Sequence, residues 1–124
     1  MRAIVIAVAI MAGAANAAMA DDLMANYYGN TVVTKSPNGE SHSHYKKDGT
    51  MDAVLSGPMG SVTLTGTWRV DASGELCRTY ANVPAMLPIQ NPLCTPWATH
   101  KVGDTWTITI GGQSRSASLV QGIQ

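Results

Sequence analysis

The chain has 124 residues, with eight basic and eight acidic side chains and no phenylalanine. This balance leaves no basic stripe, so we expect no nucleic-acid partner. No apolar segment after residue 20 is long enough to span a bilayer, so we expect no membrane insertion of that part of the chain.

Residues 1–20 have the pattern of a secretory signal peptide. Arg2 supplies a positive charge, residues 3–12 are an apolar run, and two Ala-x-Ala patterns end at Ala17 and Ala20. The pattern predicts cleavage after Ala17 or Ala20 and a periplasmic or secreted protein. The remainder, residues 21–124, is long enough for one domain with its own core.

Period-two alternation predicts that this domain is all-β. Residues 21–29 could form one helical turn or a short leading strand. Beyond them, Trp68 and Trp106 lie in apolar rows that alternate with threonine, which is typical of a half-buried strand. We expect both indoles to face one enclosed space. The predicted strands are near residues 30–35, 41–47, 50–56, 62–70, 76–82, 97–102, 105–110 and 113–120.

Tight turns join most of these strands, so about eight antiparallel strands should form a meander. Eight strands can close into a small, calycin-like barrel, which removes exposed sheet edges. A two-sheet β-sandwich is the alternative architecture.

Cys77 and Cys94 are the two cysteines of the chain. An even count in an exported protein predicts one disulfide, which acts as a structural staple.

A proline-rich loop is expected over residues 83–97. Four prolines at every fourth position exclude a helix or a central strand there. The loop is unusually apolar, and it is predicted to act as a flap over the barrel, as a lid over a ligand cavity, or as a contact surface for a partner. Its apolar residues are Met86, Leu87, Ile89 and Leu93.

His42 and His44 form the only stretch that resembles site chemistry, because residues at i and i+2 of a strand share a face. Asp48-Gly49 predicts a two-residue turn, which puts His44 opposite Ala53 and hence on the more apolar face. The histidines could bond to neighbouring hydroxyls, contact an organic ligand, or bind a metal through His42 and His44. The predicted ligand pocket is His42, His44, Met51, Leu55, Trp68 and Trp106.

Arg115 is a further candidate. If Gly111-Gly112 is a two-residue turn, Arg115 lies opposite Ile108 and faces inward, where it could bind a ligand carboxylate. A change of one residue in the loop length would turn it outward.

Several short motifs occur in order along the chain: Gly29-Asn30-Thr31, Asp48-Gly49-Thr50, Gly66-Thr67-Trp68 and Leu76-Cys77. This set, over residues 28–94, resembles small exported bacterial β-proteins of unassigned function, which implies a shared fold. Gly66-Thr67-Trp68 is also similar to the G-x-W motif of lipocalins. The overall design is similar to that of periplasmic protease inhibitors.

The sequence offers no activated nucleophile and no acid–base pair, so we expect a binding protein rather than an enzyme, and no cofactor. The first hypothesis is a barrel that binds a small, largely apolar ligand. The alternatives are a protein-binding module, such as an inhibitor of an exported enzyme, and a metal-binding protein.

Overall fold

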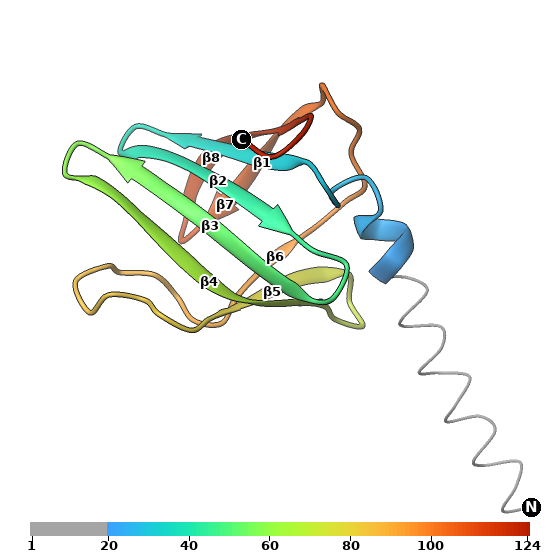
Figure 1. Ribbon diagram of the computed structural model, residues 1–124, viewed down its shortest axis with the longest axis horizontal. Helices are drawn as coiled ribbons and strands as arrows, with labels where there is room; N and C mark the ends of the chain where they lie inside the picture. The colour runs from blue at the N-terminus through green and yellow to red at the C-terminus, as the bar shows by residue number, and fades with distance from the viewer. Residues whose placement is uncertain (1–19) are drawn as a thin grey trace, which may run out of the picture.

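The computed structural model describes residues 20–124, and its eight strands form one antiparallel sheet in the order β6-β5-β4-β3-β2-β1-β8-β7. The sheet curls into a nearly closed barrel (Figure 1). This confirms the prediction of an all-β fold with eight antiparallel strands. The strands are β1 (Thr31–Ser36), β2 (Gly39–Tyr45), β3 (Thr50–Gly57), β4 (Gly60–Val70), β5 (Glu75–Tyr80), β6 (Leu93–Pro96), β7 (Thr105–Ile110) and β8 (Gln113–Val120).

The sixth strand is where the sequence prediction was wrong. β6 covers Leu93–Pro96, inside the segment expected to be a loop, and residues 97–102 form no strand. Cys77 pairs directly with Cys94 and forms a disulfide with it, which holds β6 beside β5. β6 ends the sheet order, and an edge strand tolerates proline.

The tryptophan rows face the interior as predicted. Trp68 and Trp106 pack against the buried core, whereas Thr67 and Thr107 are exposed. The interior is mainly apolar, but it also contains polar side chains such as Ser41, Arg78 and Arg115.

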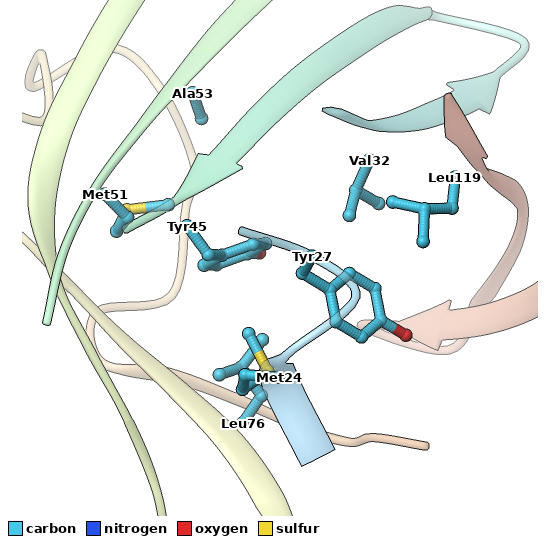
Figure 2. Close-up of a cluster of buried hydrophobic side chains, with 8 residues drawn as sticks. All are labelled: Met24, Tyr27, Val32, Tyr45, Met51, Ala53, Leu76 and Leu119. Atoms are coloured by element: carbon cyan, nitrogen blue, oxygen red, sulfur yellow. The ribbon is translucent and has the colours of Figure 1, made fainter. Parts of the chain in front are cut away.

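The segment before β1 closes one end of the barrel. Residues 20–24 form a short helix, and Met24 and Tyr27 are 0% and 1% exposed within the core cluster (Figure 2). The Tyr27 hydroxyl donates to the carbonyl of Ala98 at 2.6 Å, and its ring lies 5.3 Å from that of Trp97. We call residues 20–29 the amino-terminal plug.

The opposite end of the barrel carries the β1–β2 and β3–β4 turns and the loop between β5 and β6 (Figure 1). Within residues 20–124, no helix is long and apolar enough to cross a membrane.

Candidate ligand-binding site

Two adjoining hollows lie in the barrel: the outer one is at the end away from the amino-terminal plug, and the inner one extends into the interior as far as Tyr45 and Trp97. The outer hollow has a volume of about 490 Å³ and the inner one about 480 Å³. Leu55, Ile89 and Arg115 line both of them. Because they share these walls, we treat them together as the open-end cavity.

The loop between β5 and β6 forms one wall of this cavity. Met86 and Leu87 line the outer hollow, Leu93 lines the inner one, and Ile89 lines both. All four residues predicted to cover a pocket therefore border the open-end cavity. Met86 is 88% exposed, so its side chain lies at the rim.

Asparagine side chains fix this loop at both ends by imitating the backbone of a strand. The Asn91 amide accepts from the backbone N–H of Tyr80 and donates to its carbonyl, both at 2.9 Å. The Asn82 amide accepts from the backbone N–H of Thr65 at 2.8 Å and donates to the carbonyl of Thr63 at 3.1 Å. The loop is thus tied to β5 and to β4.

The residues predicted to line the pocket are not brought together. Leu55 lines the open-end cavity, but Met51 belongs to the buried core, and Trp68 and Trp106 pack against that core. Neither Trp68 nor Trp106 lines either hollow, whereas Trp97 lines the inner one. Apolar alternation predicts which side chains face inward, but it does not predict where along the barrel axis a cavity remains.

The two histidines lie on the outer face, contrary to the prediction. Lys46, not Lys47, bonds to Thr50 across the turn, so the β2–β3 loop has three residues and ends in Gly49 with φ 90°. His44 is consequently opposite Asp52. A shift of one residue reverses the face of every side chain in a strand, which explains the error.

The carboxyl-terminal residues cover these histidines. His44 is 8% exposed, with Nδ1 2.5 Å from Asp52 Oδ1 and Nε2 3.2 Å from the carbonyl oxygen of Gln124. His42 Nε2 lies 2.7 Å from Glu40 Oε2, and its Nδ1 lies 3.4 Å from the same Gln124 oxygen. The imidazoles thus bond to carboxylates and to the carbonyl oxygen of Gln124. No group of three or more His, Cys, Asp or Glu among residues 20–124 could hold a metal ion.

Arg115 faces the interior, as one of its two predicted registers requires. Ile108 pairs with Arg115, and Gly111 and Gly112 form the two-residue turn with φ of 59° and 80°. Positive φ at both positions is the geometry that glycine allows at no steric cost. Arg115 lines both hollows.

Arg78 is a second interior arginine, which the sequence analysis missed. It is 4% exposed and lines the inner hollow. Its Nε donates to the Tyr45 hydroxyl at 2.9 Å, its Nη1 donates to Thr95 Oγ1 at 3.1 Å, and its guanidinium carbon lies 5.0 Å from the ring centroid of Trp97. Its position could have been predicted from the sequence. Arg78 is two residues after Leu76 in β5, and residues at i and i+2 of a strand share a face.

Tyr80 adds a neutral hydroxyl to the inner hollow. Burial raises the pKa of Tyr80 to about 12, and Tyr45 contributes to this rise while the Arg78 guanidinium opposes it. The phenol is therefore protonated at neutral pH and can donate a hydrogen bond.

The open-end cavity thus combines apolar walls with nitrogen and hydroxyl donors. Apolar surface holds the body of a ligand, and a few placed polar groups orient it. No protein-family model, curated protein or solved structure matches the chain.

Proposed function

We propose that this protein is an exported, non-enzymatic barrel that binds a small, largely apolar ligand in its open-end cavity. The observation that carries the proposal is the pair of hollows of about 490 and 480 Å³ between the open end and its loop. Small-molecule sites typically occupy a few hundred Å³ and are mainly apolar. The Cys77–Cys94 disulfide agrees with a protein that works in an oxidising compartment.

A substitution that fills the cavity tests this function. Ser41 lines both hollows and lies on the interior face of β2, opposite Leu55. We expect the wild-type protein to enhance the fluorescence of the neutral dye Nile red, and Ser41→Trp to weaken its binding by roughly tenfold or more, because the indole occupies the volume that the dye needs. Circular dichroism checks that the variant keeps its β spectrum.

Ser116→Trp is the matched control. Ser116 is exposed on β8, where it pairs with Lys35. This variant should bind the dye like the wild type. Equal dye affinity in Ser41→Trp, or no dye binding by the wild type and by a panel of neutral apolar compounds, would refute the proposed function.

A protein-binding module is the second candidate, because two large apolar side chains project from the cavity rim. Met59 is 101% exposed and Met86 is 88% exposed. Such residues grouped at one rim are typical of contact surfaces. Replacing both methionines by glutamine should remove a protein contact, whereas Ser41→Trp, which changes the interior and not the rim, should leave that contact intact.

A further inference from the structure

The open-end cavity contains positive charge without a matching negative charge. Arg78 and Arg115 line the inner hollow, and no Asp or Glu does. Within residues 20–124, no carboxylate forms an ion pair with either arginine. Glu40 is the acidic residue that lines the outer hollow, but its carboxylate pairs with Lys35 and His42 on the outer face.

The same hollow also contains hydrogen-bond donors that have no acceptor. Among the described residues, Arg115 Nε and Trp97 Nε1 are the buried side-chain nitrogen and oxygen atoms that make no hydrogen bond. Both residues line the inner hollow, together with Tyr80, whose hydroxyl is protonated at neutral pH. Buried donors are nearly always satisfied in folded proteins, so an acceptor supplied by a ligand would satisfy donors that the protein itself leaves unpaired.

We propose that the ligand is an organic anion whose carboxylate binds Arg115 and whose apolar body lies against the loop between β5 and β6. This inference rests on the proposed function, and it names the chemical class of the ligand. Arg78, which lines only the inner hollow, adds to the positive potential at the carboxylate.

A carboxylate fits these donors in geometry and in charge. The planar guanidinium presents paired N–H groups that match the two oxygens of a carboxylate. A charge in a low-dielectric cavity is costly to leave unpaired, so an anion that pairs with it gains more than it would at the surface. The apolar wall formed by Leu55, Leu87 and Ile89 excludes a small inorganic anion as the best occupant.

A matched pair of ligands separates this inference from the proposed function. Decanoate and 1-decanol have the same chain length, and they differ in the charge of the head group. We expect displacement of Nile red at neutral pH to show that the wild type binds decanoate roughly tenfold more tightly than 1-decanol, because a charge-assisted hydrogen bond gives a preference of this order.

Three arginine variants assign the preference to Arg115. Arg115→Met should lose most of the preference for decanoate, because it removes the nearest cation and leaves only the potential of Arg78, and Arg115→Lys should keep more of the preference because it keeps the charge. Arg69→Met is the control, because Arg69 is exposed on β4 and lines neither hollow. It should behave as the wild type.

The remaining outcomes would overturn the inference in different ways. Equal binding of decanoate and 1-decanol by the wild type would leave the proposed function standing and reject an anionic ligand. A preference for decanoate that is as large in Arg115→Met as in the wild type would reject Arg115 as the carboxylate's partner. Binding of neither ligand, and of no neutral dye, would reject the proposed function together with the inference.

Discussion

Asp48 shows how one side chain organises the turn that decides which face the histidines occupy. Its Oδ1 accepts from the Thr50 hydroxyl at 2.6 Å and from the Thr50 backbone N–H at 2.9 Å. These bonds favour the ionised form and hold the pKa of the Asp48 carboxyl below its usual range. The Asp48 carboxylate thus stabilises a turn of three residues. The sequence had predicted a turn of two residues at this position.

This lowered pKa makes the contribution of Asp48 to stability depend on pH. A carboxyl whose pKa is lower in the folded state stabilises the fold above its unfolded pKa, and the contribution is lost as the pH falls through the folded pKa. Thr50→Val removes the largest cause, so we expect the Asp48 pKa to rise and the acid limb of the unfolding curve to start at higher pH. Carboxyl-carbon NMR titration measures the first effect. An unchanged Asp48 titration in Thr50→Val would contradict the assignment.

At the residue scale, the sequence predicts inward-facing positions wherever the turn length is correct. Arg115 was placed opposite Ile108 because Gly111-Gly112 allows a two-residue turn, and the structure has that pairing. His42 and His44 were placed on the wrong face because Asp48-Gly49 occurs in two-residue and in three-residue turns alike. The local sequence does not distinguish a two-residue turn from a three-residue turn. In the structure, the hydrogen bond between Lys46 and Thr50 shows that the turn has three residues.

At the element scale, the loop between β5 and β6 combines irregular backbone with strand-like anchoring. The prolines predicted its lack of regular structure, and its apolar residues predicted its place over the cavity. The roles of Asn82 and Asn91 as backbone partners could not be predicted, because an asparagine amide imitates a peptide group only when tertiary structure brings it beside a strand. The short strand Leu93–Pro96 was hidden for a similar reason, since the pairing of Cys94 with Cys77 creates it.

Asn91→Ala should loosen this loop without unfolding the barrel. The change removes two hydrogen bonds to Tyr80, and each contributes about 1 kcal/mol to holding the loop. We expect faster hydrogen–deuterium exchange over residues 83–92 and little change in the core strands. Gln90→Ala is the control, because the Gln90 side chain is exposed and no hydrogen bond is recorded for it within residues 20–124. Equal exchange in the two variants would show that Asn91 does not anchor the loop.

At the scale of the whole molecule, the barrel has one filled end and one hollow end. Met24 and Tyr27 fill the first, whereas the second retains the open-end cavity. The all-β class and the inward tryptophan rows follow from period-two alternation, which is a local property. The position of the cavity depends on how the amino-terminal plug packs, and the sequence left open whether residues 21–29 form a helical turn or a strand.

Two methionine variants test whether the plug is part of the fold. Met24 is 0% exposed and Met59 is 101% exposed. Met24→Ala should lower the free energy of unfolding by about 2–5 kcal/mol, because it leaves a void in the core. Met59→Ala should change it by less than about 0.5 kcal/mol. Urea denaturation followed by tryptophan fluorescence measures both. A Met24→Ala variant as stable as Met59→Ala would show that the plug contributes nothing.

The bond between Tyr27 and Ala98 joins positions that are 71 residues apart. A chain delivered from its amino terminus presents Tyr27 long before the ribosome releases Ala98. Early hairpins can form during synthesis, but the contact between Tyr27 and Ala98 can form only after most of the polypeptide has been made. Until then the apolar interior is open to solvent, so the interval before closure is when this protein most needs protection from aggregation.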